Sequence, residues 1–184
     1  MRIIGGRWRG LHLADMGRGD PAAHLRPTSD RVREAIFNLL IHGGYGDPVS
    51  GARVLDLFAG TGALGLEALS RGAASLTLVD DGVAARGLIA RNIALCKAAA
   101  VHLKSDATRL AANQGPGFDL IFLDPPYGKG LGEAALISAQ AGGWLAPAAL
   151  VVWEEGSVCL PPPGFDPLDQ RRYGDTIVTI LRVP

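Results

Sequence analysis

The sequence predicts an α/β fold in which a mostly parallel sheet carries helices on both faces. Short apolar segments of strand length alternate with longer segments whose apolar residues recur every three or four positions, and this alternation is typical of βαβ units. A glycine-rich turn at 59–62 also follows an early apolar segment, at the position where open α/β sheets bind a ligand. With 184 residues, 48% of them apolar, the chain has the size of one domain with a sizeable core.

The first 44 residues predict an extension followed by a helix. Residues 2–13 are expected to form a short hairpin that bends near its glycines, and residues 15–27, rich in Gly, Pro and Asp, are expected to form a loop. A helix is expected to begin near Thr28 and to end at Gly43-Gly44. Its apolar residues fall on one stripe: Val32, Ala35, Ile36, Leu39 and Leu40.

The rest of the chain continues the alternation. Strands are predicted at 53–58, 75–79, 101–104, 118–123, 149–153 and 176–182. Helices are predicted at 63–71, 83–97, 107–113 and 133–141. Residues 156–174 contain Pro161-Pro162-Pro163 and show no clear period, so no element is assigned there.

Composition argues against several classes of protein. No apolar run approaches the length that crosses a bilayer, and the N-terminus lacks the apolar core of a signal peptide. Cys96 and Cys159 lie far apart without companions, which indicates thiols in a reducing cytoplasm rather than a disulfide framework or a zinc site. The four histidines show no metal-ligand spacing, so no metal is expected.

The positive charge is concentrated at the N-terminus although the net charge is zero. Residues 1–33 hold seven arginines against three aspartates, a net charge of +4. Arginine is the cation best suited to bidentate phosphate contact, and Trp8 lies between Arg7 and Arg9. The segment therefore predicts contact with nucleic acid, with an ordinary solvated segment as the alternative.

The glycine-rich turn leaves two ligands open. Gly60, Gly62 and Gly65 match the dinucleotide fingerprint, and Asp80 follows Gly60 by 20 residues, where a ribose-binding acid is expected. This pattern would suit a nicotinamide-dependent oxidoreductase. Asp56, however, precedes the turn, and a carboxylate there repels a pyrophosphate but attracts a cation such as the amino acid end of S-adenosylmethionine.

A second motif follows the apolar segment 118–123. Asp124-Pro125-Pro126-Tyr127 places a carboxylate before a stiff turn and an aromatic ring after it, because two prolines fix two φ angles and remove two donors. In-plane acceptors and a stacking surface are what a planar, amine-bearing base needs for chemistry on its exocyclic nitrogen. The alternative is a structural turn with a helix-start proline.

Taken together, the motifs resemble a known family. The chain resembles the class I S-adenosylmethionine-dependent methyltransferases and, more narrowly, the bacterial RsmD family, which methylates guanine N2 in 16S ribosomal RNA at the guanosine numbered 966. The matching segments are residues 1–6, 26–38, 54–73, 118–127 and 173–176. The resemblance implies a Rossmann-like, seven-stranded sheet whose last, antiparallel strand residues 176–182 would supply. It divides the single domain 1–184 into a basic extension (1–27) and a catalytic core (28–184).

The resemblance also implies roles for individual residues. Asp124, Pro125, Pro126 and Tyr127 would hold the guanine and form the catalytic motif. The cofactor-binding residues would be Asp56, Phe58, Gly60 and Gly62 at the methionine end, Asp80 or Asp81 at the ribose, Asp106 and Ala107 at the adenine, and Thr28 and Asn38 in the element that closes over the cofactor. The RNA-binding residues would be Arg7, Trp8, Arg9, Arg26 and Arg31.

The implied activity is methyl transfer from S-adenosylmethionine to guanine N2. The expected partner is 16S ribosomal RNA, free or within the 30S subunit, and the expected state is a cytoplasmic monomer. Two alternatives stay open at this point. One is an amino-methyltransferase acting on another base, such as adenine N6 in DNA, and the other is a nicotinamide-dependent oxidoreductase or a module that only binds.

Overall fold

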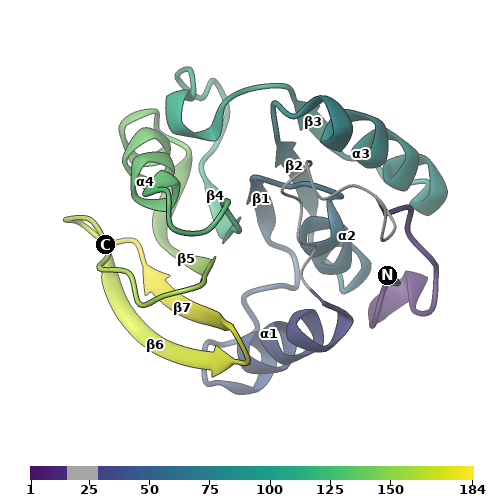
Figure 1. Cartoon of the computed structure of the whole chain (residues 1–184), viewed down its shortest axis with the longest axis horizontal. Helices are drawn as coiled ribbons and strands as arrows, with labels where there is room; N and C mark the ends of the chain where they lie inside the picture. The colour runs from purple at the N-terminus through teal and green to yellow at the C-terminus, as the bar shows by residue number, and fades with distance from the viewer. Residues whose placement is uncertain (16–28) are drawn as a thin grey trace.

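The computed structural model describes residues 1–15 and 29–184 and contains one seven-stranded sheet (Figure 1). The strands lie in the order β3-β2-β1-β4-β5-β7-β6, and only the pairs that involve β7 are antiparallel. The strand bounds are β1 Arg53–Leu57, β2 Ser75–Val79, β3 Val101–Leu103, β4 Phe118–Leu123, β5 Leu145–Glu155, β6 Asp166–Tyr173 and β7 Thr176–Arg182. The mostly parallel sheet and its antiparallel last strand are thus confirmed.

Helices cover both faces of the sheet, which explains why its central strands are apolar throughout. Helices α1 (Asp30–His42), α2 (Ala63–Ser70) and α3 (Val83–Cys96) contribute to the core cluster on one face. Helix α4 (Leu131–Ala141) contributes to the cluster on the other face, and Figure 1 shows it across the sheet from α1 and α2. Because β1 and β4 are enclosed on both sides, strand length and apolar content alone locate them in the sequence.

Helix α1 begins as its sequence indicates. The Ser29 hydroxyl caps the helix by accepting from the backbone N–H of Val32 at 3.2 Å, and the helix ends at Gly43. Of the predicted stripe, Ile36 and Leu40 are buried and the other three residues are half-buried, whereas Phe37, outside the stripe, is buried. Arg33 is also fully buried on this helix, which the apolar pattern does not predict.

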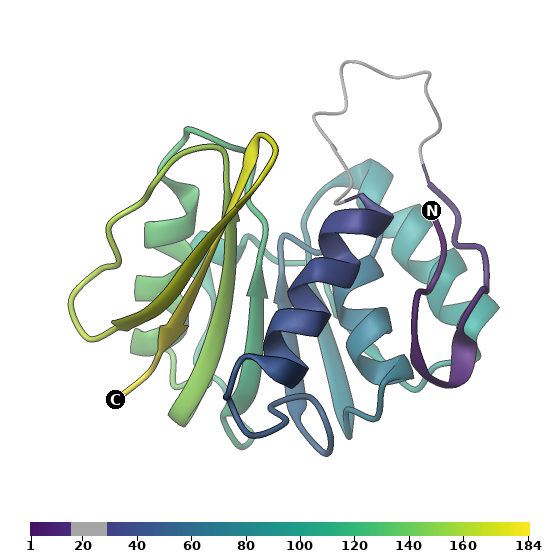
Figure 2. The same ribbon diagram turned by 90° about the horizontal axis from the view of Figure 1, so that it is seen from below.

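The N-terminal segment is less regular than the predicted hairpin. A single antiparallel bridge joins Arg2 to His12, and the 3₁₀ turn η1 (Gly6–Trp8) closes the bend. Ile3 and Leu13 are nevertheless buried in the core cluster that includes α1 and α2. Figure 2 shows this segment beside the helices of that face. Most of the predicted loop at 15–27 lies outside the described residues.

Three regions differ most from the prediction. The strand expected at 149–153 extends over Leu145–Glu155. The helix expected at 107–113 reduces to the 3₁₀ turn η3 (Ala107–Arg109). Strand β6 occupies the region where no element was assigned and forms a hairpin with β7. Most β6 residues are exposed at the edge of the sheet, so the strand has no apolar alternation from which it could be predicted.

Within the described residues, no helix is long and apolar enough to cross a membrane, and no three His, Cys, Asp or Glu side chains group as a metal site.

Candidate active site

The glycine-rich turn lies at the carboxyl edge of the sheet, directly after β1. Phe58, Gly60 and Gly62 all have positive φ angles, so the backbone turns sharply before α2 begins. Gly62 is the residue before the helix, with φ of 77°, a conformation that side chains with a Cβ rarely adopt. The turn and the start of α2 therefore present backbone N–H groups at the edge where parallel sheets bind ligands.

Asp56, in β1, connects the strand to the first turn of α2 through a hydrogen bond. It is buried, and its Oδ2 accepts from the backbone N–H of Gly65 at 2.9 Å. Burial raises the pKa of Asp56 well above its usual range, and the nearby charges of Asp124 and Asp80 raise it further. A Cβ at Gly65 would lie 3.0 Å from that oxygen and 2.5 Å from Leu76, so only glycine brings the helix this close to the carboxylate.

Asp80 follows β2 and binds the loops on either side of it. Its Oδ2 accepts from the N–H of Gly60 at 2.8 Å and its Oδ1 accepts from the N–H of Gly82 at 2.8 Å. The neighbouring Asp81 is exposed. Asp80 thus fixes the glycine turn, and each of its oxygens has a second lone pair with which it can accept from a ligand.

Asp106 follows β3 and caps η3. Its Oδ1 accepts from the backbone N–H and the hydroxyl of Thr108 at 2.8 and 2.7 Å, and these hydrogen bonds lower the pKa of Asp106. Ala107 is buried behind it. The capping role is compatible with contact to an adenine, which stays a prediction.

The Asp124-Pro125-Pro126-Tyr127 turn lies beside the glycine turn because β4 pairs with β1. The backbone N–H of Asp124 donates to the Leu57 carbonyl at 3.4 Å, which ties the two turns together. The Tyr127 hydroxyl and the Thr176 hydroxyl are 3.2 Å apart. Desolvation, together with nearby carboxylates, raises the pKa of Tyr127 to about 12, so the phenol keeps its proton to a higher pH than an ordinary tyrosine does.

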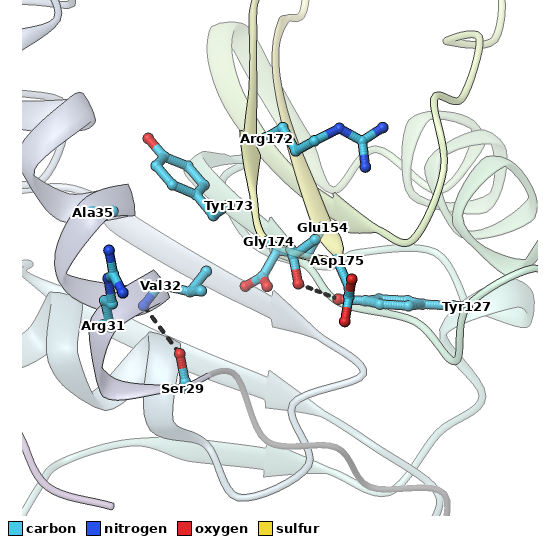
Figure 3. Close-up of a pocket in the computed structure, with 11 residues that line it drawn as sticks. Ser29, Arg31, Val32, Ala35, Tyr127, Glu154, Arg172, Tyr173, Gly174 and Asp175 are labelled. Carbon is cyan, nitrogen blue, oxygen red and sulfur yellow. Dashed lines mark hydrogen bonds between the residues drawn. The ribbon is translucent and has the colours of Figure 1, made fainter.

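A cavity of about 770 Å³ opens between α1 and the β6–β7 hairpin (Figure 3). Tyr127 forms one wall, and the first turns of α1 lie opposite. The lining residues are Ser29, Arg31, Val32, Ala35, Tyr127, Glu154, Arg172, Tyr173, Gly174, Asp175 and Thr176. The cavity beside the Asp124–Tyr127 turn thus brings together aromatic rings, carboxylates and guanidinium groups.

The sequence reasoning did not identify Glu154. This residue is 1% exposed and lines the cavity. A usable signal was present, since Glu154 follows the predicted strand 149–153 just as Asp124 follows 118–123. Arg172 of β6 was also missed, because β6 itself was not predicted, and residues 173–176 were matched to the family without a site role.

The other predicted residues lie at different distances from the cavity. Arg31 lines it, whereas Asn38 is exposed further along α1 and is not among the lining residues.

The predicted RNA-binding residues of the N-terminal segment lie at its bend. The Arg7 guanidinium lies 4.2 Å from the centre of the Trp8 ring, and the backbone N–H of Trp8 donates to the Ser70 hydroxyl at the last turn of α2. Arg9 is exposed in the same bend. Arg26 and Thr28 lie outside the described residues.

A buried ionic network holds the N-terminal segment against α1 and α2. The Glu67 carboxylate accepts from the backbone N–H groups of Ile4 and Gly5, both at 2.7 Å, and from Arg71 Nε at 2.7 Å. Arg33 Nε lies 3.5 Å from the same carboxylate, and both side chains are fully buried. The Arg33 guanidinium also donates to the Arg2 carbonyl. Residues 1–13 are therefore part of the packed structure.

Comparison with known proteins identifies the family. The profile described as Conserved hypothetical protein 95 matches residues 1–182. The ribosomal RNA small subunit methyltransferase D of Escherichia coli is 41% identical over 155 residues, which cover 84% of this chain and 74% of that protein. This chain belongs to that methyltransferase family. The methyltransferase D of Haemophilus influenzae is 36% identical over 182 residues, covering 95% of this chain and 89% of its own length.

A solved structure agrees with the methyltransferase assignment. The putative methyltransferase yhhF from Escherichia coli superimposes with a TM-score of 0.83 at 37% identity, covering 100% of this chain and 97% of its own. The prediction of a class I, S-adenosylmethionine-dependent methyltransferase of this family is therefore confirmed. The assignments of individual site residues stay predictions.

Proposed function

We propose that this methyltransferase transfers a methyl group from S-adenosylmethionine to the exocyclic N2 of a guanine in small-subunit ribosomal RNA, the guanosine 966 type of reaction. One observation carries the proposal. The backbone of Asp124 is hydrogen bonded to the end of β1, beside the glycine turn, and Tyr127 of the same motif forms a wall of the cavity. A site for a methyl donor and a site for a planar base thus adjoin at one edge of the sheet.

The residues at this edge fit S-adenosylmethionine by the chemistry of their side chains. The cofactor carries donors at its ammonium group, ribose hydroxyls and adenine amine. Three neighbouring strands each have a carboxylate near their carboxyl end. Asp56 lies within β1, Asp80 follows β2 and Asp106 comes after β3. These acceptors stand in the order in which the donors occur along the cofactor, and the turn between Phe58 and Gly62 lets a ligand approach the backbone closely.

Bound at this edge, the cofactor supplies an electrophilic methyl group on a sulfonium. The guanine N2 lone pair is delocalised into the ring and is therefore a weak nucleophile. Asp124 and the Pro125 carbonyl accept hydrogen bonds from the N2 amine, which makes the nitrogen more tetrahedral and turns its lone pair toward the methyl group. The N2–methyl bond forms as the sulfur–methyl bond breaks, and the surplus N2 proton passes to water.

Positioning supplies most of the rate in this scheme. Tyr127 stacks on the base and keeps N2 in line. No metal takes part in this scheme. The protein acts as a single-domain monomer in the cytoplasm, on ribosomal RNA that is free or assembling into the 30S subunit, and Arg7, Trp8, Arg9, Arg26 and Arg31 contact the RNA.

The change Asp124→Ala tests the proposal. We expect methyl transfer to be nearly abolished while S-adenosylmethionine affinity stays within about threefold, because the carboxylate acts on the base rather than on the cofactor. Calorimetric titration with the cofactor and mass spectrometry of methylated rRNA measure the two quantities. The exposed Asp166→Asn variant is the control for loss of one charge. Normal turnover by Asp124→Ala would refute the mechanism.

A further inference from the structure

We propose that Glu154 selects guanine at the active site by accepting a hydrogen bond from the guanine N1–H. This inference rests on the proposed function and supplies it with a physical reason for the choice of base. The Asp124–Tyr127 motif by itself accommodates any exocyclic amine, so selection between bases requires another residue.

Strand pairing places Glu154 next to Asp124. Strands β4 and β5 run parallel, and Leu123 is opposite Trp153. Glu154 is the next residue of β5, Asp124 is the residue that directly follows β4, and neighbouring strands lie about 4.8 Å apart. Phe122 and Val152 belong to the core on the α1 face, and side chains alternate along a strand. Both carboxylates therefore project toward the α1 side of the sheet.

The surroundings of Glu154 are those of a base pocket. Its side chain is 1% exposed, yet it lines the cavity together with Tyr127. Figure 3 shows it between Tyr127 and the first turn of α1. The charge of Glu154 contributes to the raised pKa of Tyr127, as do those of Asp124 and Glu155. A base stacked on this ring thus presents its edge toward the carboxylates of Glu154 and Asp124.

Two adjacent carboxylates match two adjacent donors of guanine. Guanine carries N1–H beside the N2 amine, so Glu154 accepts from N1–H while Asp124 and the Pro125 carbonyl accept from N2. Adenine carries an unprotonated N1 beside its amine. The N1 lone pair of adenine would face the Glu154 carboxylate, so N1 would be a buried acceptor that receives no hydrogen bond from this residue, which is costly.

The base 2-aminopurine separates these contributions, because it keeps the reactive N2 amine but has an unprotonated N1. The experiment compares two small-subunit rRNA substrates that are identical except for guanine or 2-aminopurine at the target position. For the wild-type protein we expect kcat/KM to fall at least about a hundredfold with 2-aminopurine, because sites built for a hydrogen bond reject analogues that cannot make it. Equal rates on the two substrates would overturn the inference without any variant.

The change Glu154→Gln then tests the side chain itself. The glutamine amide can donate to the unprotonated N1 of 2-aminopurine, so we expect the preference for guanine to narrow at least about tenfold. Asp166→Asn, at the far end of the β6–β7 hairpin, is expected to keep the wild-type preference. Thermal unfolding and cofactor titration check that each variant is folded. If Glu154→Gln keeps the wild-type preference for guanine over 2-aminopurine, the role assigned to Glu154 is wrong but the proposed function stands. If the wild-type protein fails to methylate guanine N2, the proposed function is wrong as well.

Discussion

At the scale of single residues, the site depends on groups whose neighbours are distant in sequence. Tyr127 is an example, since its hydroxyl lies 3.2 Å from that of Thr176 on β7. A Cβ on Gly156 would lie 2.9 Å from the Tyr127 ring. The ring is therefore held by the strands on the β5–β7 side of the sheet, which the motif itself does not reveal.

The pair Tyr127→Phe and Tyr127→Ala separates the ring from its hydroxyl. Tyr127→Phe keeps the ring and removes one hydrogen bond, so we expect near-normal turnover and about 1 kcal/mol less stability. Tyr127→Ala removes the stacking surface, and we expect its kcat/KM to fall about 10- to 100-fold, as stacking energies of about 1–3 kcal/mol imply. Steady-state kinetics and urea unfolding measure both effects. Equal kinetics for the two variants would show that the ring does not stack on the base.

The raised pKa of Tyr127 has a consequence for stability at high pH. An ordinary tyrosine ionises near its reference pKa of 10.0, but the folded protein holds this proton until about 12. The contribution of Tyr127 to the free energy of unfolding is fully present below pH 10. It is lost as pH rises toward 12, because the unfolded chain gives up the proton first. We expect the melting temperature of wild type to fall toward that of Tyr127→Phe over this interval. If the melting temperatures of wild type and Tyr127→Phe changed in parallel with pH, the raised pKa would not belong to Tyr127.

At the scale of elements, the N-terminal segment and helices α1 and α2 form one unit around Glu67. We expect Glu67→Ala to lower the free energy of unfolding by about 3–5 kcal/mol, because it leaves two backbone N–H groups without their acceptor and removes one of the two carboxylates that pair with the buried Arg33. Urea unfolding measures the decrease. The exposed Glu34→Ala on α1 is the control and should change stability by less than about 0.5 kcal/mol. Similar values for both would show that Glu67 does not hold the segment.

This packing also decides how contact between the N-terminal segment and RNA is tested. Deletion of residues 1–13 would remove the buried Ile3 and Leu13 together with the hydrogen bonds to Glu67, so the loss of fold would obscure any loss of binding. The exposed Arg7 and Arg9 lie at the bend, beside the last turn of α2, and they can be replaced without disturbing the core.

At the scale of the whole molecule, charge is distributed unevenly over a neutral chain. We expect the double change Arg7→Ala, Arg9→Ala to weaken RNA binding and to lower the salt slope of log K by about two, one for each phosphate that the variant no longer neutralises. Arg86→Ala, Arg91→Ala on the exposed side of α3 is the matched control. Binding to a small-subunit rRNA fragment at several salt concentrations measures the slope. A slope equal to that of the control would show that the bend does not contact RNA.

Patterns along the chain are enough to predict the alternating elements, the glycine turn and the Asp124–Tyr127 turn, and the resemblance of its motifs predicts the methyltransferase family. These features are local, because strand periodicity, a positive φ at Gly62 or two consecutive prolines depend on neighbours in the chain. Only the tertiary structure revealed the exposed edge strand β6, the burial of Arg33 against Glu67, and the position of Glu154 beside Asp124. The burial of Arg33 and the position of Glu154 depend on packing between segments far apart in sequence. Strand β6 pairs with the adjacent β7, but as an exposed edge strand it leaves no hydrophobic pattern along the chain.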